Sequence, residues 1–66
     1  MVEMSVGQKL KHLRGDKTQA EIAAQVGVTE SAIKMYEADE RSPRDSIKIR
    51  LANLFGLTVG SLFFGE

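Results

Sequence analysis

The sequence predicts an all-α fold, a single domain of five short helices spanning residues 1–66, with its core at about residues 6–64. Apolar residues recur every three or four positions along most of the chain, the spacing of one face of an amphipathic helix. Threonines and serines that can cap helix starts alternate with glycines that can end helices. Residues 47–51 alternate with a period of two, but they follow a helix start signal, so we expect them to be helical.

The size and composition exclude several kinds of site. Sixty-six residues leave room for one small core, and the absence of cysteine excludes disulfides and thiolate metal sites. The single histidine, His12, cannot form a metal site alone. No nucleophile has a neighbouring base, so we expect no enzyme activity, metal or cofactor.

The charge balance bears on nucleic-acid binding, and the lack of a membrane span and of a signal peptide predicts a cytoplasmic protein. Nine basic side chains balance nine acidic ones, which argues against a strong non-specific nucleic-acid binder but leaves a sequence-specific one open. No apolar run reaches the roughly 20 residues of a membrane span, and the first residues do not resemble a signal peptide. The initial Met1 and the residues after the last helix favour a complete chain without an effector domain, although a fragment of a longer regulator is left open.

The first two helices are predicted from their apolar stripes and from the residues at their ends. Val6, Leu10 and Leu13 form the apolar stripe of the first helix, which ends at residues 15–16. Thr18 is the expected N-cap of the second helix, in a capping box with Glu21. The remaining signals of this helix are its buried side and its terminating glycine: Ile22, Ala23, Val26 and Gly27.

The third helix runs from Thr29, its N-cap, to Glu37, with Ile33 and Tyr36 facing inward. Val28 and Ile33 can form a hydrophobic staple. The only clear loop follows, over residues 38–43, and Asp39 can take a left-handed conformation in it.

The last two helices are predicted from their caps and apolar residues. Ser42 is expected to cap the fourth helix, with Pro43 at its first position. The apolar side of this helix is Ile47, Leu51, Leu54 and Phe55. After Gly56, Thr58 caps a last helix over residues 59–63.

The second and third helices, joined by a tight turn, have the form of a device that inserts one helix into the DNA major groove. With Ile33 and Tyr36 buried, one exposed stripe remains: Glu30, Ser31, Lys34, Met35 and Ala38. Serine can bond several bases, lysine guanine or a phosphate, methionine a thymine methyl, and glutamate the cytosine N4 amino group. The alternative is that this stripe is only a solvated helix face.

Candidate residues for contacts with the DNA backbone lie on both sides of that stripe. Thr18 and Gln19 lie where free N–H groups of a helix start can bind a phosphate, and Gln19 can also reach a base. Three residues flank the loop after the third helix and can grip the DNA backbone: Arg41, Ser42 and Arg44. The simpler interpretation is that Thr18 only caps its helix and that the arginines are only solvated.

Arg14 ends the first helix and Glu37 ends the third, and each adjoins an apolar residue. We expect these opposite charges to form a structural ion pair. Such a pair adds little net stability, but loss of one partner is costly.

One set of residues falls at a characteristic spacing: Arg14, Thr18-Gln19-x-Glu21-Ile22-Ala23, Gly27-Val28-Thr29, Ile33-x-x-Tyr36-Glu37, Pro43 and Ala52-x-x-Phe55-Gly56-Leu57-Thr58-x-x-x-Leu62-Phe63. In these residues the chain resembles the Cro/cI-type (XRE family) helix-turn-helix repressors over about residues 6–64. The resemblance implies a compact, five-helix, lambda-repressor-like domain that binds double-stranded operator DNA. It also implies that Gln19 and residues 29–35, including Thr29, face the DNA.

The resemblance further implies a homodimer on a palindromic site, often formed through the last helix. The residues that this implicates are Leu57, Val59, Phe63 and Phe64. Alternatively, Phe63 fills the core and Phe64 is a solvent-exposed aromatic. Two positions depart from the pattern, because Asp39 stands where glycine is usual and Lys48 where an apolar residue is usual.

The function predicted from these observations is a sequence-specific DNA-binding transcriptional regulator, a repressor that occupies its operator as a dimer. No membrane contact and no small-molecule effector are expected. The alternative is a protein-interaction module on the same fold with little affinity for DNA, which the neutral net charge and Glu30 support.

Overall fold

The computed structural model describes residues 4–65, and within them it has five α-helices and no strand, so the predicted fold class is confirmed. The helices are α1 (Val6–Arg14), α2 (Gln19–Val26), α3 (Glu30–Glu37), α4 (Asp45–Leu54) and α5 (Val59–Phe63). None of the helices in this part of the chain has the length and apolar character needed to cross a membrane.

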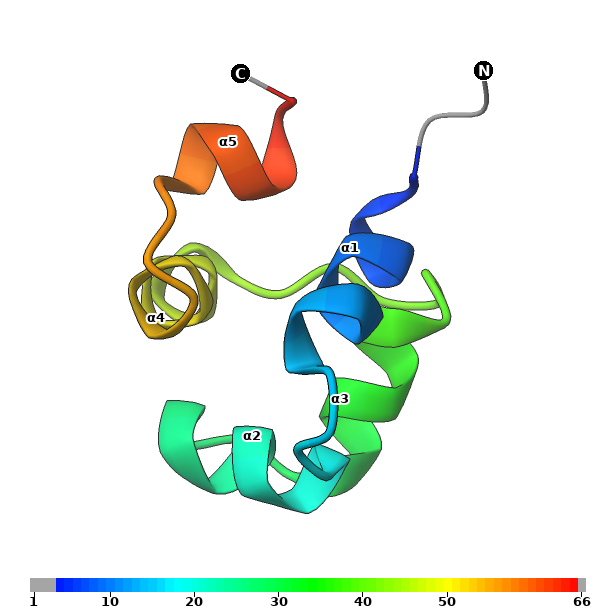
Figure 1. Ribbon diagram of the computed structural model, residues 1–66. Helices are drawn as coiled ribbons and strands as arrows, with labels where there is room; N and C mark the ends of the chain where they lie inside the picture. Colours follow the sequence, from blue (N-terminus) through cyan, green and yellow to red (C-terminus); the bar gives the residue numbers. More distant parts are fainter. Residues whose placement is uncertain (1–3, 66) are drawn as a thin grey trace.

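The helices are arranged with α2 and α3 at one end of the molecule and α5 at the other (Figure 1). α3 packs against both α2 and α1, while α4 packs against α2 on one side and α5 on the other. The three most completely buried large side chains are Val26 of α2, Leu51 of α4 and Leu62 of α5. Burying each contributes about 1.5–3 kcal/mol relative to an exposed position. Because these side chains come from α2, α4 and α5, the core joins the two ends of the molecule.

The start of α1 has a capping box that the sequence analysis missed. The Ser5 hydroxyl accepts a hydrogen bond from the Gln8 N–H (3.1 Å), and the Gln8 side chain accepts one from the Ser5 N–H (2.8 Å). Gly7 then lies against the end of α3, where an added Cβ would come within 2.3 Å of the Glu37 carbonyl oxygen. Only glycine allows the two helix backbones to approach so closely.

Asp39 has the left-handed conformation predicted for it, with φ = 59°. Its carboxylate accepts hydrogen bonds from the Gly7 N–H (2.8 Å) and from the Ser5 hydroxyl (2.6 Å). The bond from Ser5, followed by that from Gly7, holds the pKa of Asp39 below its usual range. The aspartate therefore does more than a glycine would here, because it also ties the end of α3 to the start of α1.

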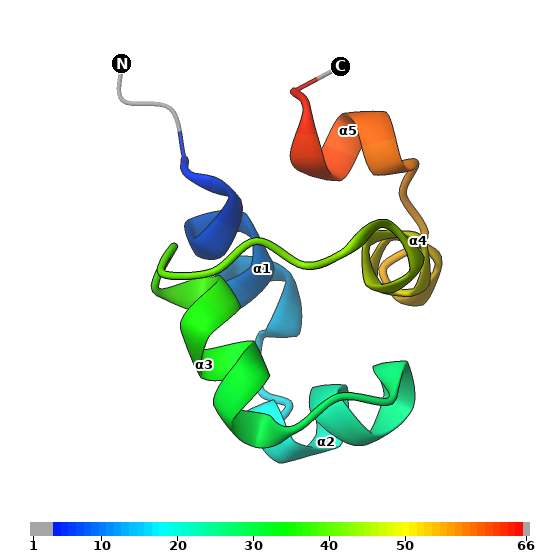
Figure 2. The same ribbon diagram turned by 180° about the vertical axis from the view of Figure 1, so that it is seen from behind.

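The predicted start of the fourth helix was wrong. α4 begins at Asp45 with Arg44 as its N-cap, and its first turn receives no hydrogen bond from a side chain of residues 4–65. Ser42 and Pro43 precede the helix in a non-helical segment, residues 41–44, that crosses from α3 to α4 (Figure 2). An extended residue spans about 3.3 Å and a helical one about 1.5 Å, so the crossing favours extended backbone over an earlier helix start.

Candidate nucleic-acid interface

Two threonines mark where α2 and α3 begin, and one glycine marks where α2 ends. The Thr18 hydroxyl accepts a hydrogen bond from the Glu21 N–H, and the Thr29 hydroxyl accepts one from the Ala32 N–H, both at 3.1 Å. Gly27 ends α2 in the left-handed conformation, with φ = 77° and ψ = 35°. Both predicted caps and the predicted stop are therefore confirmed. The full capping box predicted at Thr18 is not, since within residues 4–65 only the bond from the Glu21 N–H is found.

The predicted ion pair between Arg14 and Glu37 is confirmed, and its geometry is bidentate. Arg14 Nε donates to Glu37 Oε2 at 2.7 Å, and Nη2 donates to Oε1 at 3.1 Å. The two side chains are 17% and 7% exposed. Burial raises the pKa of Glu37, but the hydrogen bonds from Arg14 and Gln19 and the charges of Arg14 and Lys11 outweigh it and hold that pKa below its usual range.

Gln19 is held by the same carboxylate. Its Nε2 donates to Glu37 Oε1 at 3.0 Å, and this orientation is required because an ionised carboxylate only accepts hydrogen bonds. Glu37 thus joins the end of α1, the start of α2 and the end of α3. Among residues 4–65, the Gln19 Oε1 atom and its second amide hydrogen have no further partner.

The outer side of α3 matches the predicted stripe in most positions. Glu30, Ser31 and Lys34 are exposed, whereas Met35 is half-buried. Lys34 Nζ lies 3.7 Å from Glu30 Oε2, an ion pair one helical turn apart whose side chains are 62% and 52% exposed. These two charges therefore cancel on the face that was expected to meet DNA.

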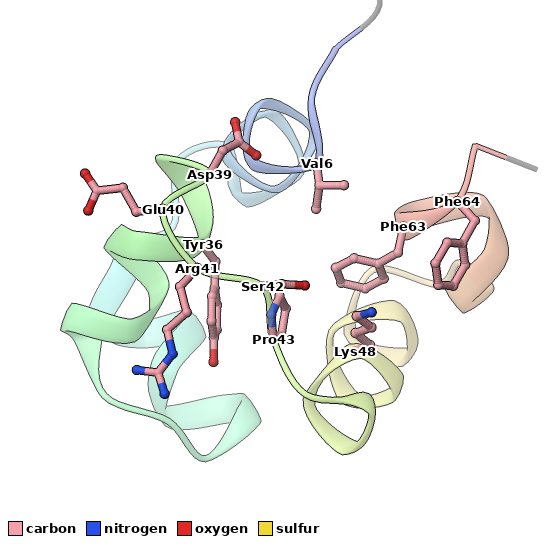
Figure 3. Close-up of a pocket in the computed structure, with 10 residues that line it drawn as sticks. All are labelled: Val6, Tyr36, Asp39, Glu40, Arg41, Ser42, Pro43, Lys48, Phe63 and Phe64. Atoms are coloured by element: carbon pink, nitrogen blue, oxygen red, sulfur yellow. The ribbon is translucent and has the colours of Figure 1, made fainter.

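An open hollow beside α3 brings together four side chains, of which three were predicted to contact the DNA backbone and one was not. It is lined in part by Arg41, Ser42, Arg44 and Arg50, and in Figure 3 the Arg41 side chain extends along α3 beside Tyr36. Arg50 was missed by the sequence analysis. Its Nη1 donates to the Val26 carbonyl oxygen at 3.1 Å, so it also caps the end of α2. The signal for Arg50 was its position three residues after the buried Ile47, which places both on one side of α4.

A second hollow lies on the other side of α3, where Thr18 and Gln19 of α2 meet Glu30 and Lys34 of α3. Lys11 of α1 also lines it and was likewise missed. Its spacing of three residues from Arg14 places it on the same side of α1. Thr18 and Gln19 are thus brought to one surface with Glu30 and Lys34 of the stripe, and basic side chains lie on both sides of α3.

Comparison with known proteins identifies the class to which this arrangement belongs. The profile of the helix-turn-helix family matches residues 10–62, most of the chain. The chain belongs to the helix-turn-helix family of DNA-binding regulators. The predicted resemblance to the Cro/cI-type (XRE family) repressors is confirmed, and α2 and α3 are the two helices of the motif.

One solved structure supports the fold of this helix-turn-helix chain independently. It is the crystal structure of the P22 c2 repressor protein in complex with synthetic operator 9T in the presence of Tl+. The TM-score is 0.90 at 23% sequence identity, over 97% of this chain and 100% of that chain. No curated protein matches the chain significantly.

The helix-turn-helix domain has a separate apolar surface at its opposite end, formed by α4 and α5. Phe64 is 65% exposed, and Leu57, Val59 and Phe63 are half-buried and pack against the core. Ile49 of α4, 52% exposed, lines one hollow with Val59 and Phe64 and was missed because it lies outside the predicted stripe of its helix.

Lys48 occupies this surface in place of the usual apolar residue. Its Nζ lies 5.6 Å from the ring centroid of Phe63 and 5.1 Å from that of Phe64, with both rings beside the ammonium group in Figure 3. A cation over an aromatic face is attractive at these distances. The aliphatic part of Lys48 thus covers apolar surface while its charge stays at the edge, which accounts for the departure from the pattern.

Proposed function

We propose that the chain is a sequence-specific transcriptional regulator, a repressor that binds a palindromic operator in cytoplasmic DNA as a homodimer. The observation that carries the proposal is the joint geometry of α2 and α3. Thr18 and Gln19 at the start of α2 adjoin an exposed face of α3, and basic side chains flank both. In helix-turn-helix proteins the second helix enters the major groove with its first residues at base edges. The P22 c2 repressor, which shares the fold, is described in complex with a synthetic operator.

The residues divide between reading and positioning. Thr29, Glu30, Ser31 and Lys34 lie at or after the start of α3 and are our candidates for base contacts, with Met35 at the edge of the groove. The candidates for phosphate contacts are Thr18, Gln19, Arg41 and Arg44, to which we add Lys11 and Arg50. Phosphate contacts fix the orientation on the duplex and base contacts supply the specificity.

The dimer is proposed to form through the apolar surface at α4 and α5. Phe64 protrudes beside an apolar hollow that Ile49 and Val59 help to line, with Asp45 and Lys48 at its rim. A knob and a hollow on one face suit a two-fold interface, where each copy presents the same patch. A standard interface takes about 800 Å² from each partner, nearly a fifth of the 4431 Å² accessible surface of this chain. A patch of a few side chains therefore favours a weak dimer that DNA stabilises.

Selection of bound duplexes from a random pool tests the proposal directly. We expect enrichment of two inverted half-sites whose centres are about one helical turn, 34–36 Å, apart. Replacing both Ser31 and Lys34 with Ala should abolish the enrichment while the helical circular-dichroism signal stays unchanged, because both side chains are exposed. The matched control replaces Ser61 of α5 and Lys9 of α1 with Ala, two positions that line neither of the hollows beside α3. Equal loss of enrichment in the control would show that the stripe does not read DNA.

Salt dependence separates this function from the protein-interaction alternative, which the cancelled charges of Glu30 and Lys34 favour. The affinity of a DNA binder falls by about 0.9 log units per log unit of salt for each phosphate neutralised. Absence of any enriched sequence, or binding without a salt dependence, would favour an interaction module.

A further inference from the structure

The ion pair between Glu30 and Lys34 lies on the face of α3 where a DNA-binding protein would gain affinity from positive charge. Glu30 Oε2 and Lys34 Nζ are 3.7 Å apart, and both side chains are largely exposed. In the described chain, Arg14 with Glu37 is the other ion pair, and it is nearly buried. Glu30 is thus a negative charge at the first helical position of α3, where base edges are read.

We propose that Glu30 is a specificity-determining residue that selects a cytosine and weakens binding to all other DNA. This inference rests on the proposed function, because it assigns a base to one residue of the same interface. The carboxylate accepts a hydrogen bond from the cytosine N4 amino group, the one donor that a C·G pair presents in the major groove. Adenine also has an amino group, but its N7 acceptor lies beside that group and repels a carboxylate.

Lys34 is the second residue that contributes to the proposed specificity. A lysine one turn after Glu30 can reach guanine O6 and N7 or a phosphate. On DNA without the cytosine, Lys34 stays paired with Glu30, and the carboxylate repels the phosphates nearby. On the matching site, the Glu30 carboxylate accepts a hydrogen bond from the cytosine amino group in place of Lys34. Lys34 can then donate to a guanine. The pair therefore lowers affinity for random DNA more than affinity for the operator.

The simpler role for Glu30 is electrostatic, since an acidic residue in the first turn of a helix interacts favourably with the helix dipole. That role requires no DNA and predicts a change in folding stability only. The experiment must therefore measure base preference and stability in the same variants.

The test compares the wild-type chain with Glu30→Gln and with the control Glu40→Gln. Glu40 is also exposed and carries the same charge, but it lies in the loop after α3, outside the helix that carries Glu30 (Figure 3). Each protein selects duplexes from one random pool. Affinities are then measured on the selected duplex, on a copy with the cytosine changed to thymine, and on a random-sequence duplex over a range of salt.

We expect the wild type to require a cytosine at one position of each half-site, with about tenfold or greater loss on changing it. Glu30→Gln should move the preference at that position to adenine, because a glutamine pairs with adenine N6 and N7. On random DNA it should bind more tightly, with a salt slope steeper by up to about 0.9 as Lys34 gains a phosphate. Glu40→Gln should keep the cytosine.

The outcomes that overturn the inference are distinct from failure of the proposed function. If the wild type selects a site but Glu30→Gln keeps its base preferences and changes only the unfolding midpoint, Glu30 has the electrostatic role alone. If both variants change the preference alike, the effect comes from net charge. If the wild type enriches no sequence, the proposed function fails and the inference fails with it.

Discussion

At the scale of single residues, Glu37 takes part both in the packing of helices and in the proposed DNA surface. It accepts hydrogen bonds from Arg14 and Gln19 although it is only 7% exposed. A carboxylate in such a place must be paired, because an isolated buried charge is costly. Glu37 therefore fixes both the packing of α1 against α3 and the orientation of the Gln19 amide at the proposed DNA surface.

Replacing Arg14 with Ala should lower the free energy of unfolding by about 3 kcal/mol, because removing one partner leaves the other charge buried and unpaired. Lys34→Ala is the matched control, since it removes the cation of an exposed ion pair, which contributes about 0–1 kcal/mol. Urea unfolding followed by circular dichroism measures both. Equal losses of unfolding free energy in the two variants would mean that the bidentate pair stabilises the fold no more than the exposed pair does.

The pH dependence of the same measurement has a definite sign. The pKa of Glu37 is lower in the folded chain than in the unfolded one, so its pairing is fully effective above the unfolded value, about 4.3. That stability is lost as the pH falls through the folded-state pKa. Arg14→Ala should therefore show a weaker loss of stability in acid than the wild type, and an unchanged acid dependence would contradict the role given to the pair.

At the scale of the helices, the contact between α1 and α3 depends on close backbone approach as much as on side chains. Gly7 touches the end of α3, and Asp39 just beyond that end bonds the Gly7 N–H. The position of α1 is thus fixed at its start by Gly7 and at its end by Arg14. Because α3 carries the proposed reading face, α1 supports that face from behind.

Replacing Gly7 with Ala should destabilise the domain by about 1–3 kcal/mol or more, as overpacking does in a rigid core. An added Cβ would lie 2.3 Å from the Glu37 carbonyl oxygen and 2.7 Å from that of Tyr36, and neither backbone atom can move without moving α3. His12→Ala, at an exposed position of α1, serves as the control and should change stability little. A Gly7 variant as stable as the control would show that α1 and α3 can separate without cost.

At the scale of the whole molecule, the proposed DNA-binding surface and the proposed dimer surface lie at opposite ends. α2 and α3 form one end and α5 the other, with α4 in contact with both α2 and α5 (Figure 1). In the proposed dimer, two reading helices are therefore held apart by the body of each domain. This separation is what allows one protein to contact two half-sites on the same side of a duplex.

Replacing Phe64 with Ser should weaken the dimer without unfolding the monomer, because this ring is 65% exposed. Ile49→Ser should act in the same way, although it lies on another helix, since the two residues line one hollow. Sedimentation, with and without operator DNA, measures the dimer. Met4→Ser removes an apolar side chain that is 45% exposed elsewhere and is the control. A dimer that persists in both variants, or a wild-type monomer even on DNA, would show that the interface is wrongly assigned.

The sequence alone determined features that depend on neighbours in the chain. The caps at Thr18, Thr29 and Thr58, the stop at Gly27 and the turn at Asp39 all follow from local backbone chemistry, and the apolar stripes follow from helical periodicity. The ion pair of Arg14 with Glu37 was also predicted, from its unusual position beside apolar residues. Family resemblance added the overall fold.

Only the tertiary structure decided what depends on distant segments. α4 starts at Asp45 because the preceding residues must cross from α3, and no local signal at Ser42 or Pro43 reports that distance. Arg50 reaches the end of α2, and Lys48 lies over the rings of Phe63 and Phe64 at the end of α5, because α4 packs between α2 and α5. Local signals mark where helices begin and end, whereas contacts between helices depend on how the whole core packs.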